Sequence, residues 1–410
     1  VNINNNYDVV ITEVGGTVGD IEGQPFYEAI RQFILEEGKE NCLVIHTTLL
    51  PYINAAGEMK TKPTQHSVMR LREIGLEPNV LVCRTEADHH LTPKLKKKLG
   101  LFCNVETEYV FESPDVDTIY EIPLVLNQQN FDEAILKRLS LKISNHKENL
   151  HMLENSIGRY KNPKHSVTIA MCGKYNGLHD AYKSILEALI HAGVENIAKV
   201  NIKWIDTEKL EKNKEKVSEF FENIHGVIIP GGFGDRGIEG KILSSQFARE
   251  NNIPFLGICL GLQCAIIDFA RNVCEMNNAN STEFKLRTKY PVIALMDGQR
   301  DINKKGATMR LGSYKCKIKR NTNAYKAYGR GIIHERHRHR YEVNNKYIEN
   351  FEKSGLIISG ENKKLNLVEM IEMKNHPWFV GVQFHPELKS RVVKTHPLFR
   401  DFIAAAIRNK

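Results

Sequence analysis

The sequence predicts an α/β protein of two domains, each built around a largely parallel β-sheet. Its 410 residues correspond to two or three domains at about 150 residues each. Short apolar segments alternate with amphipathic ones in two separate series, as happens where helices join parallel strands. The apolar segments are continuous rather than alternating, which is typical of strands that are covered on both faces.

The elements of the first series are expected to be strand 7–12, helix 25–37, strand 42–47, helix 64–74, strand 80–83 and helix 93–99. The second series is expected to contain strand 167–171, helix 181–192, strand 200–205 and strand 227–229. Between the two series, residues 140–166 are polar, basic and poor in aliphatic side chains. We therefore expect a first domain at 1–144, an interdomain linker at 145–165 and a second domain at 166–410.

Composition limits the classes of function. The 57 Lys and Arg residues and 49 Asp and Glu residues give a net charge of +8, which suits small anionic substrates and does not imply a nucleic-acid partner. The most apolar stretch, 253–270, is interrupted by Pro254, Gln263 and Asp268, so we expect no membrane span. No secretory signal opens the sequence, and the eight cysteines form no CxxC pair. Free thiols in a reducing compartment, the cytoplasm, are expected.

Cys259 is a candidate nucleophile. It lies within Gly-Ile-Cys-Leu-Gly at 257–261, which predicts a strand, a sharp turn and a helix. Small neighbours allow a strained turn that exposes the sulfur, and the N-terminus of the next helix stabilises a thiolate. The alternative is a buried core cysteine, the commoner fate of a free cysteine and our interpretation of Cys264 and Cys274.

A base for this thiol is expected at His385, which follows a predicted strand at 378–384. His385 can take the thiol proton, and Glu387 can orient the imidazole and stabilise its charged form. A lone histidine at a strand end is usually structural, but a cysteine turn followed by His-Pro-Glu is far more specific. The glycine-rich turn after 227–229 offers the Gly232 N–H, which could hold an oxyanion together with the N–H of Leu260.

The motifs Pro-Gly-Gly-Phe-Gly at 230–234, Gly-Ile-Cys-Leu-Gly-Leu-Gln at 257–263 and Phe-His-Pro-Glu at 384–387 resemble the class I, or triad, glutamine amidotransferases. The resemblance implies a flavodoxin-like second domain that hydrolyses glutamine to glutamate and ammonia through a thioester on Cys259. It implies glutamine contacts at Gly232, Leu260, Gln263, Glu283 and Arg340.

In such a site, Glu283 would pair with the ammonium group of glutamine and Arg340 with its carboxylate. The neighbouring His337 and His339 alternate with arginines, and their alternatives are metal binding and a nucleic-acid patch. Metal binding is the weaker of these, because no Cys or Asp accompanies them.

The first series carries two further signals. An apolar strand ends in Glu13, and glycines and the acids Asp20 and Glu22 follow; an acid at the end of a parallel strand is well placed to hold Mg²⁺ near a phosphate. Lys60 and Lys62 lie just before a predicted helix, an arrangement that suits a polyphosphate. The alternatives are an ordinary turn with a surface acid and a solvated lysine-rich loop.

These two segments, 13–22 and 57–67, look like the synthetase domain of the CTP synthase family, and the resemblance continues to the C-terminus. It implies a P-loop-type first domain and the conversion of UTP, ATP and glutamine to CTP, ADP, phosphate and glutamate, a step of pyrimidine nucleotide biosynthesis. Glu13 would bind Mg²⁺, and UTP or the inhibitor CTP would contact Asp20, Ile21, Glu22, Lys60, Thr61, Lys62, Thr64, Gln65 and Lys98. The resemblance also implies a homotetramer, activation by GTP, and a place for Glu28 near an intersubunit nucleotide site.

The sequence departs from the family pattern in two places. The family's phosphate-binding loop, well upstream of the Glu13 strand, is not present in this sequence, so we expect an N-terminally incomplete first domain. The segment 301–306 is a short bridge where the family carries a lid linked to GTP activation, so GTP is expected to stimulate weakly if at all.

Two rival functions are weighed. One is a different synthetase built on the same glutaminase module, against which the Lys-Thr-Lys-Pro-Thr-Gln segment at 60–65 argues. The other is a non-catalytic nucleotide-binding assembly protein, against which the complete set of Cys259, His385 and Glu387 argues.

Overall fold

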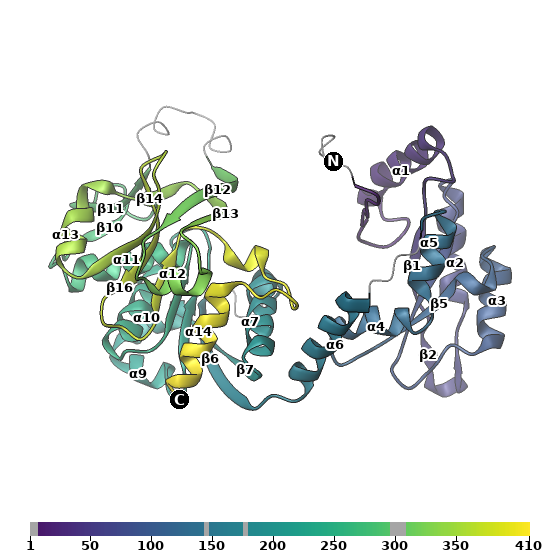
Figure 1. Cartoon of the computed structure of the whole chain (residues 1–410), viewed down its shortest axis with the longest axis horizontal. Helices are drawn as coiled ribbons and strands as arrows, with labels where there is room; N and C mark the ends of the chain where they lie inside the picture. The colour runs from purple at the N-terminus through teal and green to yellow at the C-terminus, as the bar shows by residue number, and fades with distance from the viewer. Residues whose placement is uncertain (1–6, 143–146, 175–178, 296–308) are drawn as a thin grey trace. The chain divides into compact units, whose positions relative to one another are not determined.

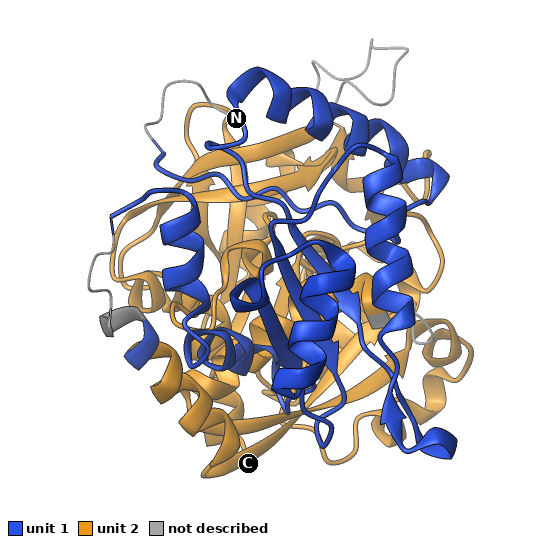
Figure 2. Ribbon diagram, turned by 90° about the vertical axis from the view of Figure 1, so that its right-hand side faces the viewer, with its two compact units in different colours: residues 1–151 blue, residues 152–410 orange. Residues whose placement is uncertain are grey.

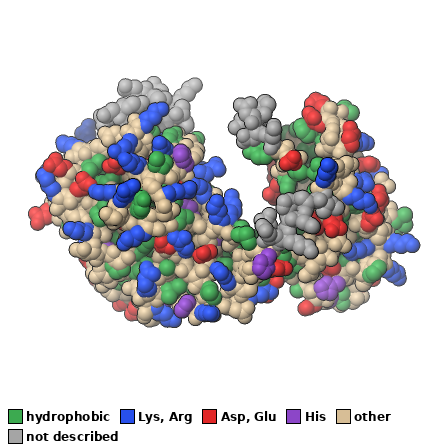
Figure 3. Space-filling view, viewed as in Figure 1, with side chains coloured by type: hydrophobic (Ala, Val, Ile, Leu, Met, Phe, Trp, Pro, Cys, Tyr) green, Lys and Arg blue, Asp and Glu red, His purple; other side chains and the backbone are tan. Residues whose placement is uncertain are grey.

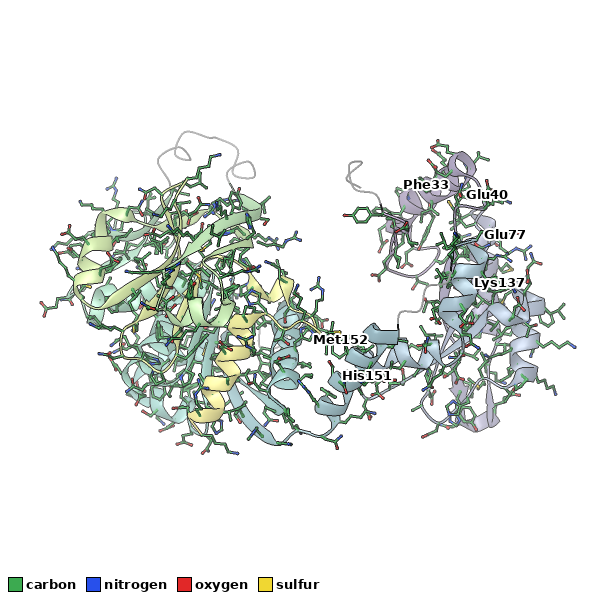
Figure 4. All side chains as sticks on the ribbon, in the orientation of Figure 1. Phe33, Glu40, Glu77, Lys137, His151 and Met152 are labelled. Atoms are coloured by element: carbon green, nitrogen blue, oxygen red, sulfur yellow. The ribbon has the colours of Figure 1, made fainter. Side chains whose placement is uncertain are left out.

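The computed structural model describes residues 7–142, 147–174, 179–295 and 309–410. The chain forms two compact units, unit 1 at 1–151 and unit 2 at 152–410 (Figure 2). The division falls inside helix α6 (Lys147–Lys161), on which His151 and Met152 are neighbours (Figure 4). Most of the expected linker is therefore helical, and the expected domain bounds stay a prediction.

Unit 1 is built on a three-stranded parallel sheet with the order β1-β4-β5. Its strands are β1 (Ile45–Leu49), β4 (Val80–Thr85) and β5 (Val110–Pro114). Helices α2 (Lys62–Glu73) and α3 (Pro93–Cys103) connect them and confirm the predicted alternation of strands and helices (Figure 1). The central strand is buried on both faces, as a continuous apolar segment requires.

The other elements of unit 1 include its longest helix, α1, and several short segments. They are η1 (Ile21–Gly23), α1 (Gln24–Glu37), β2 (Tyr52–Ile53), η2 (Asn54–Ala56), β3 (Glu58–Met59), η3 (Thr107–Tyr109), η4 (Ile119–Glu121), α4 (Ile122–Asn127) and α5 (Phe131–Arg138). Helix α1 packs Tyr27 against Leu71 and Leu76, while Phe33 on the same helix is 56% exposed (Figure 4).

The strand predicted at 7–12 is wrong. These residues form no strand, and Val10 and Ile11 are 56% and 91% exposed. A β-strand needs a neighbour that completes its ladder of backbone hydrogen bonds. Among the residues that the structure describes, no strand pairs with this segment, so an apolar sequence alone does not make it extended.

Unit 2 contains a nine-stranded sheet with the order β13-β12-β15-β16-β17-β9-β8-β6-β7. Its parallel part consists of β6 (His165–Gly173), β7 (Ala198–Asp206), β8 (Gly226–Ile229), β9 (Phe255–Ile258) and β17 (Phe379–Val382). The order β7-β6-β8-β9-β17 is 2-1-3-4-5 in chain sequence, the flavodoxin-like order, in which ligands bind outside the carboxyl ends of the strands.

An antiparallel extension continues this sheet beyond β17. It consists of β16 (Leu367–Met373), β15 (Leu356–Asn362), β12 (Arg310–Ile318) and β13 (Ile332–His339). A separate small sheet contains β10 (Ala279–Ser281), β11 (Tyr290–Leu295) and β14 (Tyr341–Val343). Strand β13 alternates exposed and buried residues, so its odd-numbered residues from Ile333 to His339 face the interior.

Helices cover both faces of the large sheet. Helices α10 (Ile238–Glu250) and α11 (Leu260–Asn272) pack on one face. Helices α7 (Lys183–Glu195) and α14 (Pro397–Arg408) lie side by side on the other (Figure 1). The remaining helices are η5 (His179–Tyr182), α8 (Thr207–Lys212), η6 (Lys214–Lys216), α9 (Val217–Phe220), α12 (Asn323–Tyr328), η8 (Asn345–Tyr347), α13 (Ile348–Lys353) and η9 (Pro386–Lys389).

The surface of unit 2 is rich in Lys and Arg side chains on the face shown in Figure 3. On the paired strands β12 and β13, Lys315, Lys317, Arg336 and Arg338 are exposed. Over the described ranges, no helix has the length and apolar character that a membrane crossing requires.

Candidate active site

Cys259 occupies the sharp turn between β9 and α11, which confirms the predicted strand, turn and helix. The expectation that this turn exposes the residue is wrong, because Cys259 is 4% exposed and packs with the buried residues of the core. Its backbone has φ 52° and ψ −99°, a region that non-glycine residues rarely adopt. The flanking glycines permit the turn: a Cβ atom on Gly261 would lie 2.3 Å from the carbonyl oxygen of Ile229, and one on Gly257 would lie 2.8 Å from the Gly261 backbone. The close approach of β8, β9 and α11 therefore depends on residues without side chains.

His385 and Glu387 lie at the carboxyl end of β17, where η9 begins. The Nδ1 of His385 lies 2.7 Å from Oε1 of Glu387, and the backbone N–H of His385 donates to the carbonyl oxygen of Arg336 at 2.8 Å. Burial disfavours the charged imidazole, but contact with Cys259 and Glu387 outweighs it and raises the pKa of His385 to about 10. The ring therefore holds a proton at neutral pH.

The turn after β8 meets both catalytic candidates. A Cβ atom on Gly231 would lie 2.9 Å from Cε1 of His385 and 3.5 Å from Cβ of Cys259. The structure thus brings the three backbone segments together at the carboxyl edge of the parallel sheet, where the flavodoxin-like order places ligands. Gly232 is the neighbour of Leu260, since a Cβ atom there would lie 3.5 Å from the Leu260 side chain.

Two amide side chains line the buried side of Cys259. Gln383 is fully buried, and its Nε2 lies 3.6 Å from the Cys259 sulfur. Gln263 donates to the backbone carbonyl of Tyr341 at 3.1 Å and to Oε1 of Gln383 at 3.3 Å. Sequence reasoning missed Gln383, which follows the end of β17 directly and lies two residues before His385.

The charge of Arg340 influences Glu283, the other residue expected to contact the charged groups of glutamine. Burial raises the pKa of Glu283, while a hydrogen bond with the Gly234 backbone and the charges of Arg340 and Lys174 oppose the rise. The Nε of Arg340 is buried and has no hydrogen-bond partner among the described residues. A carboxylate and a guanidinium are the groups that suit a ligand carrying both an ammonium and a carboxylate.

His337 and His339 are part of the interior. The two rings share a hydrogen bond of 2.9 Å between Nδ1 of His337 and Nε2 of His339. Burial lowers the pKa of His337 to about 2 and that of His339 to about 3, so both are neutral. Both side chains face inward and so add nothing to the exposed surface of Arg336 and Arg338, and the described residues contain no group of three or more metal-ligating side chains.

Lys241 on α10 is a buried cation that sequence reasoning missed. It is 1% exposed, and its Nζ would lie 3.6 Å from a Cβ atom on Gly232. It forms no ion pair within the described part of the chain, and burial lowers its pKa. A lysine in the pattern of an amphipathic helix would ordinarily be assigned to the solvent face.

The expected nucleotide residues of unit 1 lie around η1 and the start of α2. Asp20 precedes η1, and its Oδ2 accepts a hydrogen bond of 2.9 Å from the Thr17 N–H; Ile21 and Glu22 are exposed within η1. Ile21 also lines an open hollow together with Arg70. Glu13 is exposed, so it could offer one carboxylate to a metal ion but does not form a metal centre with other described residues.

Two lysines of the expected phosphate site, Lys60 and Lys98, influence the same acid, Glu58. Lys60 forms an ion pair with Glu58, and the charge of Lys98 on α3 is a further influence that lowers the pKa of Glu58. Lys62, the first residue of α2, is exposed. Lys60 and Lys98 therefore act on the same carboxylate, while Lys62 lies at the N-terminus of α2.

The remaining expected nucleotide residues of this segment have buried side chains. They are Thr61, Thr64 and Gln65. The Oγ1 of Thr64 bonds at 3.2 Å to the side chain of Thr48 and to the carbonyl oxygen of Leu49. Gln65 donates to Oγ1 of Thr61 at 3.1 Å, and all three are buried. Thr64 therefore attaches α2 to β1, whereas Gln65 bonds within the helix to its N-cap residue, Thr61.

Two further expectations concern neighbouring regions. Glu28 on α1 bonds to Arg31 and Gln32, and these bonds lower its pKa to about 2; it lines the same hollow as Ile21. The segment 301–306, expected to be a shortened lid, lies outside the described residues.

Comparison with known proteins matches a protein family to each unit. The family described as "CTP synthase N-terminus" matches residues 1–141, and "Glutamine amidotransferase class-I" matches residues 178–405. The CTP synthase of Caldanaerobacter subterraneus subsp. tengcongensis is 54% identical over 405 residues, covering 99% of this chain and 74% of that protein. That of Chloroherpeton thalassium is 55% identical over 402 residues, covering 98% and 72%.

A solved structure agrees with the assignment of unit 2. The glutaminase domain of Trypanosoma brucei CTPS with bound acivicin is 38% identical, with a TM-score of 0.56, covering 59% of this chain and 94% of that one. The two-domain α/β architecture and the flavodoxin-like sheet agree with these matches. The chain therefore belongs to the CTP synthase family, whose members are glutamine-hydrolysing ligases.

Proposed function

We propose that unit 2 hydrolyses glutamine with Cys259 as nucleophile, His385 as general acid and base, and Glu387 as the residue that orients His385. The observation that carries this proposal is the meeting of Cys259 and His385 at Gly231, with His385 held at 2.7 Å by Glu387. Ammonia then aminates UTP to CTP at a site in unit 1, at the expense of ATP.

The chemistry of the proposed hydrolysis is acyl transfer. The sulfur of Cys259, its proton transferred to His385, attacks the side-chain amide carbon of glutamine. The N–H groups of Gly232 and Leu260 stabilise the oxyanion that forms. As the tetrahedral intermediate collapses, His385 gives its proton to the departing ammonia and a thioester remains. Water, deprotonated by His385, then releases glutamate and restores the thiol.

Glutamine is oriented in this proposal by its own charges. Glu283 takes the ammonium group, and Arg340 takes the carboxylate, which supplies the partner that its buried Nε otherwise lacks. Gln263 holds Gln383 beside the Cys259 sulfur. These residues act on binding and alignment, because none of them exchanges a proton in the reaction.

In unit 1, we assign UTP or the inhibitor CTP to the surface formed by Asp20, Ile21, Glu22, Lys60, Lys62 and Lys98, with Thr61, Thr64 and Gln65 supporting α2. The exposed lysines near the N-terminus of α2 support this assignment. ATP phosphorylates the uracil O4, and ammonia displaces that phosphate. Mg²⁺, which takes one or two protein carboxylates and otherwise phosphates and water, would find one such carboxylate at Glu13.

Three properties of the family extend this proposal. GTP would act as an activator, the protein would form a homotetramer, and Glu28 would lie near an intersubunit nucleotide site. A cytoplasmic location is supported by the eight free cysteines, because disulfides are rare in reducing compartments.

The test separates the two chemistries. Glutamate release and CTP formation are measured with glutamine or with ammonium salts as nitrogen source, in the parent protein and in Cys259→Ala. We expect Cys259→Ala to lose glutamate release. In a protein that carries the family's phosphate-binding loop, Cys259→Ala should also lose glutamine-dependent CTP formation while ammonia-dependent synthesis is unchanged. Acivicin, which the trypanosomal glutaminase domain carries, should inhibit only the glutamine-dependent reaction. Glutamate release by Cys259→Ala would overturn the proposal.

A further inference from the structure

Glu335, a buried acid on β13, forms an ion pair with Lys389, the last residue of the segment 385–389. This segment, which contains His385, Glu387 and the helix η9, is called the catalytic turn below. The Nζ of Lys389 lies 3.1 Å from Oε1 of Glu335 and also donates to the backbone carbonyl of His334. Lys389 is the last residue of η9, two positions after Glu387. Its side chain is 36% exposed, whereas that of Glu335 is 1% exposed, so the ion pair reaches from the surface into the interior.

The partners of Glu335 favour its ionised form, which the ion pair with Lys389 requires. Its Oε1 accepts a hydrogen bond of 3.1 Å from the Tyr328 hydroxyl and lies 3.4 Å from Nε2 of His396. Burial opposes its ionisation, but the bond with His396 and the charges of His396 and Lys389 outweigh burial, and the pKa of Glu335 falls below its usual value. A buried carboxylate kept charged needs such partners, and Lys389 is the one among them that belongs to η9.

The catalytic turn depends on bonds from outside itself. Helix η9 has only four residues, and a short 3₁₀ segment of this kind is weakly held by its own hydrogen bonds. Its start is fixed where the His385 N–H donates to the Arg336 carbonyl at 2.8 Å. Its end is fixed by Lys389 on His334 and Glu335. Three consecutive residues of β13 therefore hold both ends of the turn.

We propose that the Glu335–Lys389 ion pair is a clamp that positions Glu387 against His385. The inference rests on the proposed roles of His385 and Glu387 and adds two positioning residues to them. The relation between His385 and Glu387 is set by the backbone of η9, because the two are only two residues apart. Catalytic groups displaced by about 1 Å can lose about a hundredfold in rate, so a clamp on the far end of the turn matters for turnover.

The clamp predicts which kinetic constant changes. Glu283 and Arg340, the proposed glutamine contacts, lie outside η9, so their binding of glutamine should not depend on Lys389. We expect Lys389→Met to lower kcat for glutamate release ten- to hundredfold while KM for glutamine stays within about twofold. Glu335→Gln should act in the same direction, and the double variant should be no worse than the more damaged single variant, because the pair works as a unit.

The pH profile distinguishes positioning from loss of charge. Removing the positive charge of Lys389 would, by electrostatics alone, favour the protonated form of His385 and move the alkaline limb of kcat to higher pH. Loosening Glu387 from His385 removes support for that proton and moves the limb to lower pH. We expect a shift to lower pH in Lys389→Met, which a merely structural role or a charge effect would not produce.

The experiment uses the full chain and six variants, each checked for its unfolding temperature. Lys389→Arg keeps the charge and the reach and should retain near-parent kcat. Lys353→Met, which removes an exposed Lys–Glu pair on α13, is the matched control and should leave both kinetic constants unchanged. Cys259→Ala reports separately on the proposed function. Unchanged kcat and pH limb in a folded Lys389→Met overturn the clamp; an active Cys259→Ala overturns the proposed function instead. If Lys389→Met does not fold, a failure of Glu335→Gln to change kcat overturns the clamp.

Discussion

The Nδ1 of His385 lies 2.7 Å from Oε1 of Glu387, although the two residues are separated by a single proline. The carboxylate is nearly buried, so its charge acts on the imidazole with little screening by water. This short contact and the neighbouring sulfur keep the ring protonated, with a pKa near 10. The imidazolium can therefore supply the proton that departing ammonia needs.

Glu387→Gln should move the alkaline limb of glutamate release to lower pH. The pKa of His385 is raised by Cys259 and Glu387, so removing one of these charges lowers it, and the proton for ammonia is lost at a lower pH. A protonated group of this kind also adds stability below its unfolded pKa of about 6.5, and that stability is lost as pH rises through about 10. Rates and unfolding temperatures measured from pH 6 to 10.5 check both effects; an unmoved limb would contradict the role of Glu387.

An electrophilic glutamine analogue should label Cys259 ahead of the other seven cysteines. Burial raises the pKa of the other buried thiols, to about 11 for Cys83 and Cys103 and to about 12 for Cys172 and Cys264. Thiolates are the reactive form, so these thiols should react slowly. Peptide mapping after brief labelling measures the order, and faster labelling of Cys264 would count against the assignment of Cys259.

Glu283→Gln should weaken glutamine binding without lowering stability. Burial raises the pKa of this carboxyl, which means that its ionised form costs folding free energy at neutral pH, and an amide of the same shape removes that cost. A hydrogen bond to a charged group is worth about 1.5–3 kcal/mol, so KM for glutamine should rise about ten- to hundredfold. Kinetics and thermal unfolding check the two parts together; a lower unfolding temperature with unchanged KM would indicate a structural role.

Gly231→Ala should abolish glutamate release, because the added methyl group would lie 2.9 Å from the His385 ring. We expect a loss in kcat of at least about a hundredfold, since the ring must move off the line to Cys259. Gly158→Ala on α6 is the matched control, where a Cβ atom meets nothing within 4 Å. The control should keep full activity and gain about 0.5–1 kcal/mol in stability. An active Gly231→Ala would show that the turn can shift without consequence.

Much of the fold and the centre of the site could be predicted, because both depend on local patterns. Buried parallel strands are continuous apolar segments of the sequence, and the glycines on either side of Cys259 predict its turn. The strand expected at 7–12 failed because a strand depends on a partner, which the local sequence does not contain. Likewise, an inward lysine such as Lys241 follows no pattern on its helix.

The supports of the site were harder to foresee than its reactive groups. Glu335 and Lys389 are far apart in sequence, and their meeting depends on how β13 and η9 pack. The sequence alone does not show that a side chain is tolerated less well at Gly231 than at Gly232. A Cβ atom on Gly231 would lie 2.9 Å from His385, whereas one on Gly232 would lie 3.5 Å from Leu260. Distances between separate segments arise from the assembled sheet, and only the structure supplies them.

The backbone of Cys259, with φ 52° and ψ −99°, also affects how an inert form of the protein is best made. An L-residue in such a conformation costs of order 1–3 kcal/mol, and alanine at this position would carry that cost just as cysteine does. Glycine has no Cβ atom and adopts positive φ freely. Cys259→Gly should therefore have a higher free energy of unfolding than Cys259→Ala, and neither variant can form a thioester. For soaking crystals with intact glutamine, glycine is therefore the better replacement, and the nucleophile itself is a point at which the fold gives up stability for reactivity.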